Sequence, residues 1–380
     1  MTEADLNIIA EIRSEIASEY AEPHDHPWII GYSGGKDSTL VAHLVFEHLL
    51  SLSPSARRRD VHIVANDTLV ESPLVIAHLK ASVERLRDAA EAFALPVRCQ
   101  ITRPSVDKSF WVNLIGRGYP PPNRMFRWCT DRMKIQPTSQ YIKEQALSTG
   151  QVILLLGVRR SESAQRAQTV AKYDNGQRLN RHNDIPECRV FRPIVELSTK
   201  QVWEFLAFND PPWGGSHAEL IKLYKDASGG ECPVVTQKAD APSCGTSSSR
   251  FGCWTCTVVE KDRSLEGFVE AGFEEFGPLL DFRDWLASIR SDPEKRMIRR
   301  RDGRVTITSN GTFVPGPFTP ATRREMLQYL LRVQDQVGYE LISAKEIEVI
   351  ETIWSEDAVF IAVASQKELY ENRAITKSGT

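Results

Sequence analysis

Six consecutive residues combine the groups that bind phosphate in proteins: Ser33, Gly34, Gly35, Lys36, Asp37 and Ser38. Two adjacent glycines let the backbone approach an anion and turn its N–H groups toward it, and the hydroxyls and Lys36 complete the site. A helix that begins near Asp37 adds the positive end of its dipole. The spacing differs from that of common nucleoside triphosphatases and of dinucleotide-binding proteins. We therefore predict a phosphate-binding loop, the alternative being a plain glycine-rich turn between a strand and a helix.

The segments on either side of this loop have the order that such a site needs. Residues 28–31 form a short apolar strand before it, and the residues after it place apolar side chains on one helical face. Helical patterns also cover residues 3–20 and 73–93. Further apolar runs predict strands at 61–65 and 151–158, and residues 97–102 are another strand candidate. Strands alternating with helices predict an α/β fold, a doubly wound parallel sheet of the Rossmann-like kind.

Length and charge set limits on the class of protein. The chain has 380 residues, enough for two or three compact units. Lys+Arg 47 against Asp+Glu 50 gives a net charge of −3, so bulk charge does not indicate a nucleic-acid partner. The apolar runs are far shorter than the roughly twenty residues that span a bilayer, and the N-terminus does not resemble a signal peptide. We expect a cytoplasmic protein without a membrane segment.

Charged side chains follow two of the predicted strands. Asp67 comes after the second strand, and Arg159, Arg160 and Arg166 come after the fourth. Open α/β sheets bind ligands at the carboxyl ends of their strands, so we expect the arginines to face that crevice. Guanidinium groups suit phosphate oxygens there. The alternative is a set of solvated surface arginines.

Four of the seven cysteines lie close together in sequence: Cys232, Cys244, Cys253 and Cys256. They belong to a stretch, 214–264, that is rich in Gly, Ser and Pro and has too few apolar side chains to build a core. Thiolates are soft ligands that suit zinc or an iron–sulfur cluster, and the spacing leaves both open. We predict a first domain over 1–213, a cluster-binding segment over 214–264 and a C-terminal α+β region over 265–380.

The loop Ser33–Ser38 resembles the PP-loop of the ATP pyrophosphatase superfamily. This resemblance implies that the loop binds ATP with Mg²⁺ and that ATP is cleaved between its α and β phosphates, with Lys36 and Asp37 in catalytic positions. The Asp67-Thr68 pair is similar to one that relatives of phosphoadenosine phosphosulfate (PAPS) reductase place beside the nucleotide. Residues 157–166 resemble the Gly-x-Arg…Glu-Ser-x-x-Arg segment of that branch, which implies contacts between Arg159, Arg160 and Arg166 and an anionic substrate.

The segment around the cysteines resembles one particular group of proteins within this superfamily. Residues 250–257, Arg-Phe-Gly-Cys-Trp-Thr-Cys-Thr, together with 67–71 and 127–134, resemble the sulfurtransferases of bacterial DNA phosphorothioation (DndC type) and their single-strand relatives (SspD type). The likeness implies a [4Fe–4S] cluster on Cys232, Cys244, Cys253 and Cys256. It also implies DNA as substrate, a cysteine desulfurase as sulfur donor and ATPase or nicking subunits as further partners.

A fifth cysteine, Cys129, has basic neighbours in sequence. Arg132 and Lys134 follow it closely, and nearby cations favour the thiolate that a persulfide carrier needs. The alternative is an inert cysteine packed at the start of a helix. The family pattern implies that Lys134 reaches an anionic group. Cys99 and Cys188 are predicted to be structural.

The leading hypothesis is ATP-dependent DNA phosphorothioation. A reductase is disfavoured because no cysteine follows Cys256 and no adjacent cysteine pair occurs. One alternative is a tRNA thiolase that adenylylates a base oxygen. The other is a nucleic-acid-binding subunit that senses ATP and uses the basic run 295–304 as its footprint.

Overall fold

The computed structural model describes residues 2–228, 251–301, 303–307, 309, 311 and 313–357, without the side chains of 165, 166 and 313. The chain forms two compact units. The first comprises Met1–Arg103, Lys134–Trp254 and Asp262–Glu274, and the second comprises Pro104–Met133, Thr255–Lys261 and Glu275–Thr380. Each unit therefore consists of several separate stretches of the chain.

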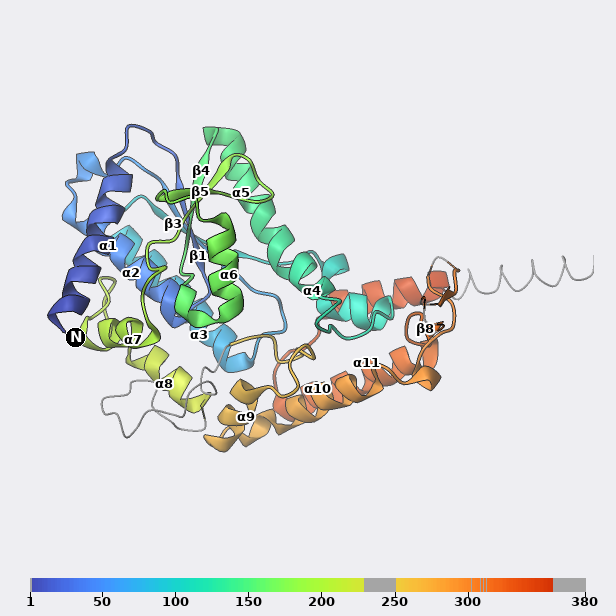
Figure 1. Cartoon of the computed structure of the whole chain (residues 1–380). Helices are drawn as coiled ribbons and strands as arrows, with labels where there is room; N and C mark the ends of the chain where they lie inside the picture. Colours follow the sequence, from blue (N-terminus) through green and yellow to red (C-terminus); the bar gives the residue numbers. More distant parts are fainter. Residues whose placement is uncertain are drawn as a thin grey trace, which may run out of the picture. The chain divides into compact units, whose positions relative to one another are not determined.

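The first unit contains a six-stranded sheet in the order β3-β2-β1-β4-β6-β5 (Figure 1). The strands are Trp28–Tyr32 (β1), Val61–Asn66 (β2), Val97–Thr102 (β3), Val152–Leu156 (β4), Leu179–Arg181 (β5) and Cys188–Phe191 (β6). Five strands are parallel, and β5 runs antiparallel to β6 at the edge. The α/β doubly wound sheet predicted from the sequence is confirmed.

Helices cover both faces of this sheet. The helices of this unit are Glu3–Ala21 (α1), Lys36–Ser51 (α2), Pro73–Ala92 (α3), Gln136–Thr149 (α5), Ala164–Tyr173 (α6), Thr199–Phe208 (α7), Ala218–Asp226 (α8) and Arg263–Glu270 (α9). Side chains of β1 alternate, so that Trp28 and Ile30 join the apolar cluster under α1, α2, α3, α7 and α8, whereas Ile29 joins the cluster under α5. The two clusters form the core and fix the edge at which each strand ends.

The second unit consists mainly of helices. Its helices are Trp128–Thr130 (α4), Gly277–Ile289 (α10), Pro320–Val337 (α11) and residues 344–357, and its small sheet pairs Thr306–Ile307 (β7) with Phe313–Val314 (β8). The indole N–H of Trp111 donates to the Leu341 carbonyl at 2.6 Å, and that of Trp354 donates to the Ile115 carbonyl at 3.1 Å. These bonds join the early segment of the unit to its C-terminal helices.

Short turns of other helix types complete the described fold. Turns of 3₁₀ helix occur at Pro54–Ala56, Val106–Lys108, Arg160–Glu162, Glu274–Phe276 and Pro293–Lys295, and π-helical turns at Val112–Gly116 and Asp131–Ile135. Within the described residues, no helix is both long and apolar enough to cross a membrane.

Two features differ from the sequence reading of domains. The helix α8 falls inside the predicted cluster-binding segment, yet its Leu220 lies in the core of the first unit. Residues 104–133 fall inside the predicted first domain, yet they cluster with the second unit. The strands β5 and β6 were not predicted, because they are short and interrupted by polar residues such as Asn180 and Arg189.

Candidate functional site

The phosphate loop follows β1 and precedes α2, as the sequence predicts. β1 lies between β2 and β4, which is where the order of the sheet reverses, and open α/β sheets bind ligands at this switch point. Gly34 has φ of 71°, a left-handed conformation that favours glycine. Gly35 is the residue before α2, so the N–H groups of the first helical turn lie at the loop. The backbone geometry therefore fits a phosphate group.

The loop is held by hydrogen bonds from its own serines and from α3. The Ser33 N–H donates to Ser38 Oγ at 3.2 Å, and Ser38 Oγ donates to the Gly35 carbonyl at 3.0 Å. His78 Nε2 lies 3.2 Å from the Gly34 carbonyl oxygen. Ser38 and His78 thus lie against the carbonyl oxygens of Gly35 and Gly34, which would otherwise repel a bound anion.

Asp37 accepts hydrogen bonds from two cations. Lys36 Nζ lies 3.0 Å from Asp37 Oδ2, and Arg159 Nε lies 2.6 Å from Asp37 Oδ1. The Arg159 side chain is 1% exposed and also donates to Ser161 Oγ at 2.7 Å and to the Leu197 carbonyl at 3.2 Å. The structure thus gives Arg159 a positioning contact to the loop.

The end of β4 approaches the start of α2 very closely. A Cβ atom at Gly157 would lie 2.7 Å from the Asp37 carbonyl carbon and oxygen, a distance that real side chains do not tolerate. Only glycine fits this position, and the close approach is what brings Arg159 to Asp37.

Of the other two predicted arginines, the structure describes the side chain of Arg160 but not that of Arg166. Arg160 Nε lies 2.7 Å from Glu196 Oε1, and its Nη2 pairs with Asp174, so this guanidinium contacts two carboxylates. Arg166 lies in α6, and its side chain is outside the described residues. The catalytic roles of Arg159, Arg160 and Arg166 stay predictions.

Tyr224 of α8 lies against the loop and was not found from the sequence. The Lys36 N–H donates to the Tyr224 hydroxyl at 3.5 Å, and Lys36 Nζ lies 5.5 Å from the centre of the Tyr224 ring. The Tyr224 and Phe251 rings are in contact, with centroids 4.3 Å apart. Burial raises the pKa of the Tyr224 phenol, so it stays a neutral hydroxyl. No motif marks this residue, because its position depends on the packing of α8.

Acidic side chains lie beyond β2, next to the strand that carries the loop. Asp67 is 2% exposed, and Arg103 Nε donates to its Oδ2 at 3.0 Å. The Asn66 side-chain amide donates to the Lys134 carbonyl at 2.9 Å, which brings the chain around Lys134 to the end of β2. Asp67 and Lys134, both predicted site residues, therefore lie at the edge of the sheet that bears the loop.

Cys253 is fixed at this same edge. It forms a β-bridge with Glu71, and the next N–H, that of Trp254, donates to the Val70 carbonyl at 3.0 Å. Its Sγ lies 3.4 Å from Thr68 Oγ1, which also bonds to the Glu71 carboxylate. Burial raises the pKa of the Glu71 carboxyl, although the charge of Lys134 and the hydrogen bonds from Thr68 oppose part of that rise. The thiol thus lies beside a carboxyl group that holds its proton more strongly than usual.

The structure describes two of the four predicted cluster ligands, Cys253 and Cys256. Cys232 and Cys244 lie outside the described residues. Cys256 belongs to the second unit, where the buried Arg283 of α10 donates to its carbonyl at 3.1 Å. No group of three or more His, Cys, Asp or Glu side chains in the described ranges is placed to hold a metal ion. The thiolate donor set of the four cysteines fits an iron–sulfur cluster in chemistry, and the ligand set stays a prediction.

Cys129 lies in α4 of the second unit and is half-buried. Nearby in that unit, Arg132 donates to Asn113 Oδ1 at 2.5 Å and to the Tyr119 hydroxyl at 3.2 Å. A persulfide role for Cys129 stays a prediction.

The basic run 295–304 is largely occupied within the second unit. Lys295 Nζ pairs with Glu325 at 2.6 Å, and Arg296 donates to the carbonyls of Gly316 and Arg290. Burial lowers the pKa of Arg296 to about 10. These two side chains hold the unit together, whereas Arg299, Arg300, Arg301 and Arg304 are exposed.

Comparison with known proteins places the chain in a family. Residues 27–259 match the phosphoadenosine phosphosulfate reductase domain. An uncharacterized protein of Methanocaldococcus jannaschii is 25% identical over 235 residues, which span 62% of this chain and 37% of that relative. The chain therefore matches well under half of the relative's length.

Three solved structures align with the chain at low similarity. A PAPS reductase of Candida auris has a TM-score of 0.32 at 12% identity, covering 54% of this chain and 86% of its own. The U34-tRNA thiolase NcsA of Methanococcus maripaludis, solved with its [4Fe–4S] cluster, has a TM-score of 0.31 at 12% identity, covering 74% and 80%. An FMN adenylyltransferase of Candida glabrata has a TM-score of 0.34 at 11% identity, covering 84% and 83%.

The family match includes the loop, the segment after β2, the Gly157–Arg159 segment and Cys253, and it covers more than half of the chain. The chain belongs to the phosphoadenosine phosphosulfate reductase domain family, within the PP-loop superfamily of ATP-using enzymes.

Proposed function

We propose that this enzyme carries out ATP-dependent phosphorothioation of DNA. A non-bridging oxygen of a backbone phosphodiester attacks the α phosphorus of ATP, and pyrophosphate leaves. Hydrosulfide, released from a desulfurase persulfide by a thiol reductant, then attacks the adenylylated DNA phosphorus. A P–S bond forms, the P–O bond to AMP breaks, and AMP leaves. The net reaction joins DNA phosphate, ATP and hydrosulfide to give DNA phosphorothioate, AMP and pyrophosphate, without a change of oxidation state.

The observation that carries the proposal is the location of a thiol and of the phosphate loop at one edge of the sheet. β1 and β2 are neighbours, the loop follows β1, and Cys253 lies 3.4 Å from Thr68 just after β2. Adenylylation and the arrival of sulfur must occur at the same phosphate, so a site for sulfur chemistry beside the ATP loop supports this reaction. Neither group alone would favour this reaction over other uses of ATP.

The side chains of the loop have a clear part in this reaction. Lys36 and the N–H groups at the start of α2 stabilise the charge on the departing pyrophosphate. Arg159 holds Asp37 and, through it, the orientation of Lys36. A [4Fe–4S] cluster held by Cys232, Cys244, Cys253 and Cys256 would, when bound, hold the segment that carries them against the DNA.

DNA is preferred to other sulfur acceptors because of the sequence around the cysteines. Residues 250–257 resemble the phosphorothioation sulfurtransferases, and no cysteine after Cys256 is available for the attack that a PAPS reductase needs. A cysteine desulfurase and the other phosphorothioation subunits are the partners that this proposal requires.

Radiosulfur labelling of cells that carry the gene with its genomic neighbours tests the proposal. Wild type is compared with Lys36→Ala and Cys253→Ala, and DNA, tRNA and small metabolites are separated before digestion. We expect label in DNA dinucleotides that falls at least about a hundredfold in both variants. Arg87→Ala and Cys99→Ala are matched controls, because Arg87 is an exposed residue of α3 and burial raises the pKa of Cys99 to about 11.

Other locations of the label would replace the proposal. Label in tRNA nucleosides that depends on Lys36 and Cys253 would assign the enzyme to tRNA thiolation. Label that is the same in all variants would leave ATP sensing by a nucleic-acid-binding subunit as the remaining reading.

A further inference from the structure

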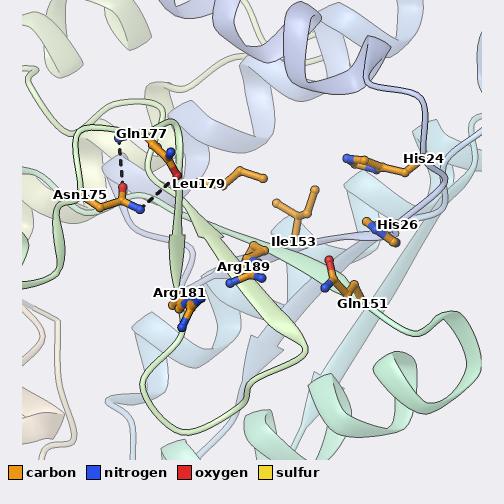
Figure 2. Close-up of a pocket in the computed structure, with 9 residues that line it drawn as sticks. All are labelled: His24, His26, Gln151, Ile153, Asn175, Gln177, Leu179, Arg181 and Arg189. Atoms are coloured by element: carbon orange, nitrogen blue, oxygen red, sulfur yellow. Dashed lines mark hydrogen bonds between the residues drawn. The ribbon is translucent and has the colours of Figure 1, made fainter.

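The first unit has a cavity of about 380 Å³ at the edge of the sheet opposite to the phosphate loop (Figure 2). Its lining includes residues that precede β1 and β4, and residues of the β5–β6 pair: His24, His26, Gln151, Ile153, Asn175, Gln177, Leu179, Arg181 and Arg189. A five-residue strand separates the two edges by roughly 16 Å. The cavity is therefore distinct from the site of the loop.

Two arginines of the cavity lining lie on neighbouring strands of the β5–β6 pair. Arg181 of β5 is directly opposite Arg189 of β6 in the antiparallel register, so both side chains emerge on the same face of the sheet. Figure 2 shows the two side chains next to each other. Two like charges directly opposite each other destabilise a strand pair unless an anion neutralises them.

No carboxylate within the described ranges performs that neutralisation. Among the ion pairs of these residues none includes Arg181 or Arg189, so neither is paired with Asp184 or Glu187 of the intervening turn. Glu19, near His24, is already paired with Arg178 at 3.2 Å. The pair of guanidinium groups thus presents two positive charges to the cavity.

We propose that this cavity binds a small organic phosphomonoester, with its phosphate between Arg181 and Arg189. A phosphomonoester carries about two negative charges at neutral pH, whereas a carboxylate or a backbone phosphodiester carries one, so it alone matches both arginines with a single group. Arginine forks also fit tetrahedral phosphate oxygens.

The size and lining of the cavity indicate that the phosphate carries an organic part. About 380 Å³ falls in the range of small-molecule sites and far exceeds a bare phosphate ion. Ile153 and Leu179 provide apolar surface, and Gln151 adds an amide that can bond to hydroxyl groups. The His24 and His26 rings stack with centroids 4.3 Å apart and form one wall.

Calorimetric titration with ribose 5-phosphate, with ribose and inorganic phosphate as comparisons, tests this proposal. The buffer is phosphate-free and the ionic strength is matched with NaCl. We expect ribose 5-phosphate to bind the wild type and Lys36→Ala alike, because the loop is not involved, and ribose not to bind. Arg181→Gln and Arg189→Gln should each weaken binding by about tenfold or more. Arg87→Gln, an exposed arginine of α3, is the matched control and should bind as the wild type does.

A stability measurement separates loss of the site from loss of the fold. Without phosphate, Arg189→Gln should melt at or above the temperature of the wild type, because it removes the repulsion from Arg181, and Arg189→Lys should keep part of the affinity. The proposal is overturned if binding vanishes in Lys36→Ala and persists in the two glutamine variants. It is equally overturned if millimolar ribose 5-phosphate does not bind, or if only a single-stranded oligonucleotide without a terminal phosphate binds through these arginines.

Discussion

At the scale of single residues, the carboxylate of Asp37 accepts from Lys36, which the sequence assigns to ATP, and from Arg159, which the family resemblance assigns to an anionic substrate. Lys36 and Arg159 lie 3.0 and 2.6 Å from its two oxygens, so the three side chains together carry one net positive charge. Of the two cations, Lys36 is the one at the loop itself, whereas Arg159 is 1% exposed. We therefore expect Lys36 and the backbone N–H groups to meet the charge of a bound phosphate, with Arg159 acting through Asp37.

Gly157→Ala tests how closely this arrangement must be held. A methyl group 2.7 Å from the Asp37 backbone forces β4 and α2 apart, so we expect a loss of stability of about 1–3 kcal/mol. We also expect ATP–pyrophosphate exchange to fall about tenfold or more, because Arg159 and Asp37 separate. Denaturant unfolding and the exchange assay measure the two effects.

Gly277→Ala is the matched control for that change. Gly277 begins α10, and no atom lies within 4 Å of a Cβ atom built there, so this variant should keep full stability and activity. Equal behaviour of the two alanine variants would show that the contact at Gly157 does not matter.

At the scale of elements, α8 is tied to α2 by a pair of buried histidines. His43 Nδ1 of α2 lies 3.2 Å from Nε2 of His217, the residue before α8, and His217 is 6% exposed. Burial first, and the neighbouring His43 second, lower the pKa of His217 to about 4. Because α8 carries Tyr224 to the loop, this pair also governs the surroundings of Lys36.

The low pKa of His217 makes the fold sensitive to mild acid. Between pH 6.5 and about 4 the unfolded chain binds a proton that the folded chain does not, so stability falls as the pH drops through this window. From pH 7.5 to pH 5 we expect the wild type to lose about 2 kcal/mol more unfolding free energy than His217→Gln does. Urea unfolding at the two pH values gives this double difference, and identical losses in both proteins would exclude the histidine as the cause.

The parts of the fold that could be predicted are those whose signals are local. β1, β2 and β4 are mainly apolar runs, β3 alternates apolar and polar residues, and the loop is contiguous in sequence, so all of them were found. β5 and β6 have only three and four residues, Leu-Asn-Arg and Cys-Arg-Val-Phe, which is too short for a period to be read. Tyr224 and the contact between Gly157 and Asp37 depend on elements far apart in the chain, and only the packed structure brings them to the loop.

At the scale of the whole molecule, the two units are interleaved along the chain. The second unit takes residues 104–133 from between two parts of the first, and these residues include Phe110, Trp111 and Leu114, each at most 2% exposed. Their apolar partners include α10, α11 and residues 341–354 of the same unit. Because each unit is built from separate stretches of the chain, deleting any one continuous stretch removes core residues that the remaining stretches pack against.

A chain that ends after Glu274 should therefore fail to stay soluble. The truncation leaves the apolar side chains of 104–133 in water, and burial of each large one is worth about 1.5–3 kcal/mol. Sedimentation and binding of a hydrophobic dye measure the result, with a chain that ends after Asp357 as the control. A soluble monomeric product with native near-ultraviolet circular dichroism would contradict the expectation.

The contact between Tyr224 and Phe251 has a consequence for how this protein can evolve. The two rings, with centroids 4.3 Å apart, bring α8 and the chain at Phe251 together beside the loop. Doubling the length of a flexible connection between two fixed residues costs only about 0.6 kcal/mol in closure entropy. The number of residues between Tyr224 and Phe251 can therefore vary among homologues at little cost to this contact, as long as the cysteines assigned to the cluster are kept.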